Sequence, residues 1–216
     1  MNGGYRGMIA LVPALPTGPD KKHLDWTIAA FDDFASFFAA LAPHATTPLA
    51  YRSTGIELRF MRSPKARTPS AYAQGWVVAY NLAGSLHTSA AAVRETLFHE
   101  VFHLNDAAHG DWSIKTLGKS YDAIVNKCGA NTACLSRFAP NDTMVRGGTY
   151  YAFQPGNDVR EYAAELSVRY LKEQRARLDG KTVTTPFKCG AEANGAAWSA
   201  FVAEFMGGAD LVPACK

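Results

Sequence analysis

The chain has 216 residues, of which 48% are hydrophobic and 19% charged, and its formal net charge is +3. The length suits one globular domain, and the apolar content is enough for a core, which excludes a mainly disordered chain. The basic residues are scattered, and no apolar run is long enough to cross a bilayer, so we expect neither a nucleic-acid partner nor a membrane partner.

Strands are predicted mainly in the first half of the chain. In chain order, the sequence predicts a strand over 8–15, a helix over 24–41, a strand over 51–61, a loop over 63–70 and a strand over 76–80. The strands are apolar, β-branched or alternating in polarity, as strands with a buried face should be. The helix carries large apolar side chains at helical spacings and ends before Pro43.

Helices are predicted in the second half, over 90–106, 112–125, 158–178 and 196–205. Strands that come early and helices that come late predict an α+β fold. We expect a single domain over 1–216, in which a sheet-containing subdomain covers about 1–110 and a mainly helical subdomain covers about 111–216.

The helix predicted over 90–106 contains the sequence His-Glu-Val-Phe-His, with His99, Glu100 and His103 as its polar members. Residues four apart on a helix share a face, with Cβ atoms about 5–6 Å apart, so both imidazoles can reach one metal ion. Glu100 is offset around the helix and would flank the metal, where it could take a proton from an activated water. The spacing predicts a Zn²⁺ site with Glu100 as general base.

This motif resembles that of the zincin metallopeptidases. The resemblance implies a zinc-dependent peptide hydrolase whose active site lies between an N-terminal mixed sheet and a C-terminal helical part. The predicted strand over 76–80 precedes the motif helix, and in zincins the edge strand in that position pairs with the bound peptide.

A catalytic zinc needs a third protein ligand, and Glu161 is the first candidate. Glu161 and Glu165 stand one turn apart in the helix predicted over 158–178, so Glu161 could bind zinc while Glu165 orients an imidazole ligand from behind. The segment resembles that of gluzincins, in particular the lethal-factor-like and proline-specific secreted peptidases. The alternative is a capping arrangement, with Asp158 as N-cap and Glu161 at the third helical position.

His109 is the second candidate for the third ligand. It stands where the metzincin pattern has its third histidine, although Asp106 replaces the glycine whose left-handed turn brings that histidine back to the metal. Asp tolerates the left-handed region, so a metzincin-type site stays open. Met144 could then be the methionine of the family's turn.

The resemblance also implies a tyrosine that stabilises the oxyanion. Tyr150 and Tyr151 precede the glutamate helix, and Tyr151 is the candidate, although its distance from Glu161 is a few residues longer than in the lethal-factor-like families; a buried aromatic pair is the alternative. We expect a monomeric endopeptidase acting on peptide or protein substrates with one catalytic zinc. A zincin-like zinc-binding module without activity, and a zinc hydrolase of cell-wall peptides, are the competing functions.

Four cysteines form a close pair, Cys128 and Cys134, and a wider pair, Cys189 and Cys215. Neither has the spacing of a zinc ribbon or a redox motif, and an even number in loop-like surroundings predicts two disulfides, 128–134 and 189–215. The alternative is four unrelated reduced thiols. Disulfides imply an oxidising compartment, so we expect a secreted or periplasmic protein whose leader is absent from this sequence.

Overall fold

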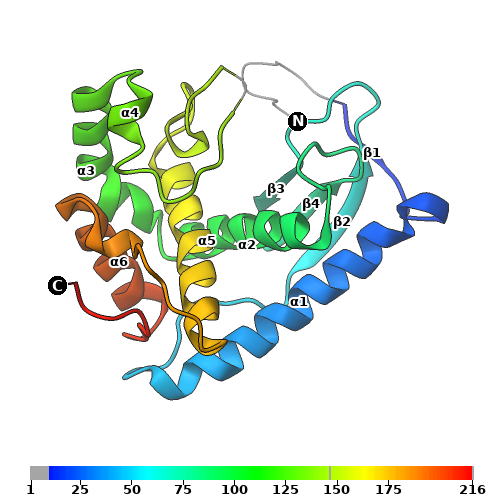
Figure 1. Ribbon diagram of the computed structural model, residues 1–216. Helices are drawn as coiled ribbons and strands as arrows, with labels where there is room; N and C mark the ends of the chain where they lie inside the picture. The colour runs from blue at the N-terminus through cyan, green and yellow to red at the C-terminus, as the bar shows by residue number, and fades with distance from the viewer. Residues whose placement is uncertain (1–9, 146, 216) are drawn as a thin grey trace. The chain divides into compact units, whose positions relative to one another are not determined.

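The computed structural model describes residues 10–145 and 147–215, which form two compact units (Figure 1). Of these described residues, the first unit contains 10–36 and Ser53–Asn105. The second unit contains Phe37–Arg52, 106–145 and 147–215. A small sheet accompanies a mainly helical chain, so the predicted α+β class is confirmed. The expected subdomains, about 1–110 and about 111–216, would place 37–52 in the first part of the molecule, whereas this segment belongs to the second unit.

The sheet belongs to the first unit. Its strands are β1 (Val12–Pro13), β2 (Glu57–Arg62), β3 (Ala71–Gln74) and β4 (Val77–Asn81). They lie in the order β1-β2-β4-β3; β2 and β4 are parallel, and the two outer pairs are antiparallel. The first two strands are shorter than predicted, and residues 8 and 9 of the first prediction lie outside the described residues.

A two-residue turn joins β3 to β4. Gly75 and Trp76 both have positive φ, 59° and 63°, which is the backbone of a type I′ hairpin turn. Trp76 therefore belongs to the turn and not to the strand predicted over 76–80. The hairpin also adds β3, which the sequence analysis missed, because four residues with one aromatic and no β-branched side chain give little strand signal.

This hairpin corrects the expectation that the strand before the motif helix is an edge strand. β4 lies between β2 and β3, so its main-chain groups on both sides are paired within the sheet. Among the described residues, the edges of the sheet are β1 and β3.

Two long helices contribute most of their length to the first unit: α1 (Lys21–Leu41), up to Ser36, and α2 (Ala90–Ala108), up to Asn105. A short 3-10 turn, η2 (Gly18–Asp20), precedes α1. Within the unit, the rings of Phe34 on α1 and Phe98 on α2 meet edge to face with centroids 5.2 Å apart. The apolar side chains that recur at spacings of three or four residues along α2 are buried: Val93, Leu97, Val101 and Leu104. This packing fixes the rotation of α2 about its axis and hence the direction of its polar motif residues.

A buried pair of histidines lies against β4. His23 Nδ1 is 2.8 Å from the Tyr80 hydroxyl, and the His87 ring stacks on the Tyr80 ring at 3.8 Å. His87 Nδ1 donates to the carbonyl of Asn81 (3.0 Å), whereas its buried Nε2 has no hydrogen-bond partner among the described residues. Burial lowers the pKa of His87 to about 4, and burial also lowers the pKa of His23.

We expect His87 to make the protein less stable in mild acid. Between pH 6.5 and pH 4 the unfolded chain protonates this histidine and the folded chain does not, so the free energy of unfolding falls as pH falls, by roughly 3 kcal/mol at most. Urea unfolding at pH 7 and pH 5 should show a smaller loss for His87→Gln than for wild type. The exposed His44 gives the control, His44→Gln; equal losses in wild type and His87→Gln would contradict the prediction.

The second unit is built from helices. Its helices are α3 (Trp112–Cys128), α4 (Thr132–Leu135), α5 (Val159–Leu178) and α6 (Glu192–Phe205), with 3-10 turns η3 (Ala42–His44), η4 (Tyr151–Phe153) and η5 (Phe187–Cys189). Four of its aromatic side chains are fully buried around α5 and α6: Tyr170, Trp198, Phe201 and Phe205. All predicted helices of this half are present, and α4 was not predicted.

The segment 37–52 joins this unit by aromatic and main-chain contacts. The ring of Tyr51 meets that of Phe205 on α6 edge to face with centroids 6.3 Å apart. The carbonyl of Gly207 accepts from the main-chain N–H groups of Thr46 (2.8 Å) and Thr47 (3.2 Å). A Cβ atom at Gly207 would lie 2.1 Å from the Thr47 carbonyl oxygen, so only glycine allows this close approach.

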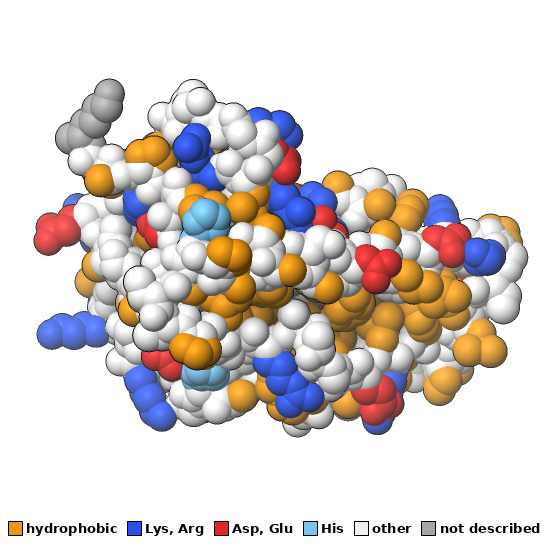
Figure 2. Space-filling model, turned by 90° about the horizontal axis from the view of Figure 1, so that it is seen from below, with side chains coloured by type: hydrophobic (Ala, Val, Ile, Leu, Met, Phe, Trp, Pro, Cys, Tyr) orange, Lys and Arg blue, Asp and Glu red, His pale blue; other side chains and the backbone are white. Residues whose placement is uncertain are grey.

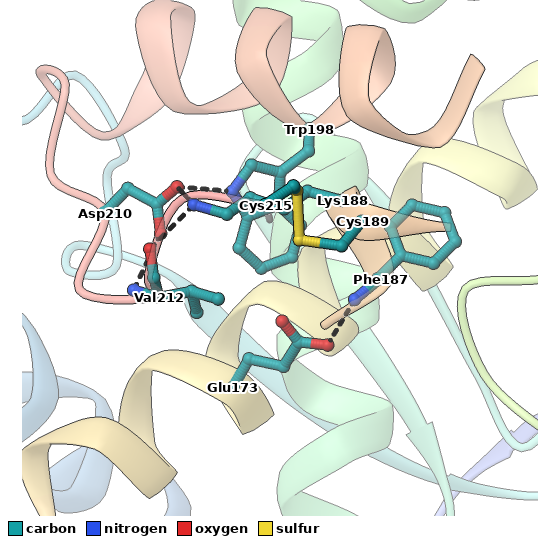
Figure 3. The surroundings of a disulfide bond; sticks show 8 residues. All are labelled: Glu173, Phe187, Lys188, Cys189, Trp198, Asp210, Val212 and Cys215. Atoms are coloured by element: carbon teal, nitrogen blue, oxygen red, sulfur yellow. Dashed lines mark hydrogen bonds and ion pairs between the residues drawn. A yellow bond between two sulfur atoms is a disulfide. The ribbon is translucent and has the colours of Figure 1, made fainter. Parts of the chain in front are cut away.

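Two disulfides join the predicted pairs, Cys128–Cys134 and Cys189–Cys215. The second closes 26 residues of chain and contributes about 3–4 kcal/mol in a chain-entropy estimate. Figure 3 shows its surroundings, where Asp210 accepts from Lys188 Nζ (2.7 Å) and Trp198 Nε1 (2.8 Å). The disulfide and the contact with Lys188 fasten the C-terminal segment to η5, and the contact with Trp198 fastens it to α6. Both disulfides are compatible with an extracellular or periplasmic protein.

The surface carries both signs of charge. Figure 2 shows acidic and basic side chains interspersed on the face it draws. Among the described residues, no helix is both long and apolar enough to span a membrane.

Candidate metal centre

Two imidazoles meet on α2. His99 and His103 are one helical turn apart, and their Nε2 atoms lie 3.1 Å from each other. Two nitrogens bound to one tetrahedral zinc at 2.0–2.1 Å would be about 3.3 Å apart, so a small adjustment would let both lone pairs share an ion. Their ring planes are 77° apart, which lets both nitrogens face one point.

A carboxylate completes the group. Ligand atoms of His99, His103 and Glu161 all lie within 4.8 Å of one another. Two imidazoles and one carboxylate form a donor set that suits zinc and leaves a coordination position open for water or substrate. The three residues predicted as ligands are therefore together in the structure and could hold a metal ion.

The start of α5 places Glu161 in the first helical turn. Asp158 is the N-cap, and its carboxylate accepts a hydrogen bond from the main-chain N–H of Arg160 (2.8 Å). Negative charge is favourable at this end of a helix because the N–H groups there point outward. The capping arrangement considered as an alternative is thus present, and it is compatible with Glu161 being a ligand.

Aromatic packing supports the beginning of α5 within the second unit. The ring of Tyr162 lies 5.9 Å from that of Tyr121 on α3 and 5.6 Å from that of Phe153 on η4. Burial raises the pKa of Tyr162, and burial also raises that of Tyr121 to about 12, so both hydroxyls stay protonated near neutral pH. These rings fix the segment that carries Glu161 against η4 and α3.

Glu100 is buried on α2, directly after His99. A buried carboxylate is costly unless it is hydrogen-bonded or charge-paired, and Glu100 has such an interaction in the folded chain. Its role as a general base stays a prediction.

Tyr151 is half-buried in η4 and is held through its main chain. Its N–H donates to the carbonyl of Thr143 (2.8 Å), and its carbonyl accepts from the side-chain amide of Asn157 (2.9 Å). The contact of its hydroxyl with an oxyanion stays a prediction.

His109 makes a different contact. α2 stays helical through Asp106 to Ala108, without the left-handed turn of the metzincin pattern, and the buried Asp106 carboxylate accepts from the N–H and the hydroxyl of Ser113, each at 2.7 Å. His109 Nδ1 lies 2.6 Å from a carboxylate oxygen of Glu204. Asp106 therefore anchors the start of α3, and His109 does not belong to the group of ligand atoms.

Glu165 is 7% exposed and has two partners that the sequence analysis missed. Its Oε2 accepts from the amide of Asn141 (3.1 Å) and the hydroxyl of Thr143 (3.2 Å). Both residues belong to a Gly-, Asn- and Pro-rich stretch that predicts only a loop. Nothing in the spacing of the sequence indicates that this loop contacts α5. The polar side chains of Asn141 and Thr143 were the only sign that they could be hydrogen-bond partners.

Comparison of the chain with family models, with curated proteins and with solved structures finds no match.

Proposed function

We propose that this protein is a zinc-dependent endopeptidase of the gluzincin type that acts outside the cytoplasm. The observation that supports it is the meeting of His99, His103 and Glu161, with Glu100 beside the first ligand on the same helix. A metal-storage site has no need of that extra carboxylate, whereas hydrolysis needs a general base there. The two disulfides are compatible with the proposed location.

In the proposed peptide-bond hydrolysis, Glu100 and Tyr151 have separate roles beside a bound zinc ion. A bound zinc ion supplies Lewis acidity, which activates a water molecule and polarises the scissile carbonyl. Glu100 takes the proton of the attacking water and passes it to the leaving amine. Tyr151 donates a hydrogen bond to the oxygen on which negative charge develops.

A peptide substrate would be recognised in part through its main chain. If it adds to the sheet, as the resemblance to zincins suggests, the edge it meets is that of β3 (Ala71–Gln74), since β4 is paired on both sides. We propose a monomer acting on peptides or proteins, without a nucleic-acid or membrane partner.

The test is hydrolysis by the purified, zinc-equilibrated chain of a mixed peptide library and, in parallel, of peptidoglycan peptides, with products identified by mass spectrometry. We expect cleavage within library peptides that a zinc chelator stops and added zinc restores. Cleavage of peptidoglycan peptides alone would replace the proposed substrate class. No cleavage of either by a zinc-loaded chain would indicate a binding module and overturn the proposal.

A further inference from the structure

A buried amide and a buried carboxylate meet one helical turn beyond Glu161. The side-chain nitrogen of Asn141 donates both to the main-chain carbonyl of Glu165 (2.7 Å) and to its carboxylate oxygen Oε2 (3.1 Å). The hydroxyl of Thr143 donates to the same oxygen (3.2 Å). Asn141 and Glu165 are each 7% exposed.

These contacts fix the carboxylate in one orientation. One amide group holds both the backbone and the side chain of the same residue, so Glu165 has little freedom to rotate. Lys172 Nζ lies 3.5 Å from Asn141 Oδ1. Because an ammonium group is a donor, it favours the orientation of the Asn141 amide in which the oxygen faces Lys172 and the NH₂ group faces Glu165. The orientation of the Asn141 amide is therefore consistent with its contacts to Glu165 and to Lys172.

The position of this carboxylate links it to the ligand group. Residues four apart on a helix share a face, so Glu165 follows Glu161 along the same side of α5. A carboxylate buried there is costly unless donors compensate it, and an apolar side chain would fill the same space without that cost. The presence of two dedicated donors indicates that the charge itself is needed.

We propose that Asn141, assisted by Thr143, is a positioning residue for the metal centre: it holds the Glu165 carboxylate in the place where it supports the ligands. The inference rests on the proposed metal site but not on peptidase activity. Residues behind the ligands of a metal typically change metal affinity by about 10–100-fold when they are replaced. Asn141→Ala should therefore weaken zinc binding by about 10–100-fold.

The experiment measures zinc affinity by competition with a chelating dye, and the melting temperature without metal, for wild type and four variants. Thr143→Val, which lacks the hydroxyl, should bind zinc more weakly than Thr143→Ser, which keeps it. Asn194→Ala is the matched control. Asn194 is also buried, and its side-chain amide donates to a main-chain carbonyl, that of Arg137 (2.9 Å), instead of to a carboxylate. It should lose stability and keep wild-type affinity.

The outcomes separate this inference from the proposed function. Wild-type affinity in Asn141→Ala, beside a wild type that binds zinc, would overturn the inference alone. A wild type that binds no zinc would overturn the proposed function and this inference with it. If Asn141→Ala does not fold, the two Thr143 variants decide: equal affinities would overturn the inference.

Discussion

Replacing Glu100 with glutamine is expected to stop turnover and to leave the metal bound. Glutamine keeps the size of the side chain and cannot accept the proton of the attacking water, and loss of a general base typically reduces turnover by about 10²–10⁴-fold. His99, His103 and Glu161 are unchanged in this variant, so the zinc content should equal that of wild type. The measurement is the rate of cleavage of a library-selected peptide, with zinc content determined on the same sample.

The matched control for this variant is Glu95→Gln. Glu95 is a half-buried carboxylate on the same helix and is not part of the ligand group, so the control removes the same charge from α2. It should cleave at the wild-type rate. Near wild-type cleavage by Glu100→Gln would show that the proposed mechanism is wrong.

The second large effect is expected at Glu161. Glu161→Ala removes the only carboxylate of the ligand group in the described chain. Replacing a residue that only contacts a ligand typically lowers metal affinity by up to about 100-fold, so we expect the loss of a ligand itself to lower zinc affinity by more than that. The N-cap contact of Asp158 remains, so α5 should still form, which circular dichroism can check. Zinc affinity is measured by chelator competition.

His109→Ala distinguishes the two candidate third ligands in the same assay. Because His109 pairs with Glu204 in the structure, this variant should keep its zinc affinity. If His109→Ala lost zinc and Glu161→Ala kept it, the metzincin-type reading would replace the present one.

Local patterns predicted much of the fold and the ligand group. The spacing of Val93, Leu97 and Val101 predicts α2, because one face of a helix repeats every three to four residues. The capping residue Asp158 predicts the start of α5, and the position of Glu161 follows from it. Such features depend on neighbours in sequence, which is why a single sequence shows them.

Features that depend on distant residues could not be predicted. β3 forms because the turn at Gly75 and Trp76 brings it beside β4, and its own residues give little sign of it. The attachment of 37–52 depends on the main chain of Gly207, far along the sequence. The pairing of His109 with Glu204 and of Asn141 with Glu165 likewise leaves no local pattern.

The central claim is that His99, His103 and Glu161 bind one zinc ion. The most direct test is elemental analysis of the chain after equilibration with zinc and removal of the excess, for wild type and for the double variant His99→Ala/His103→Ala. We predict one zinc per wild-type chain and none in the double variant. A folded wild-type chain without zinc, or a double variant that retains one, would contradict the claim.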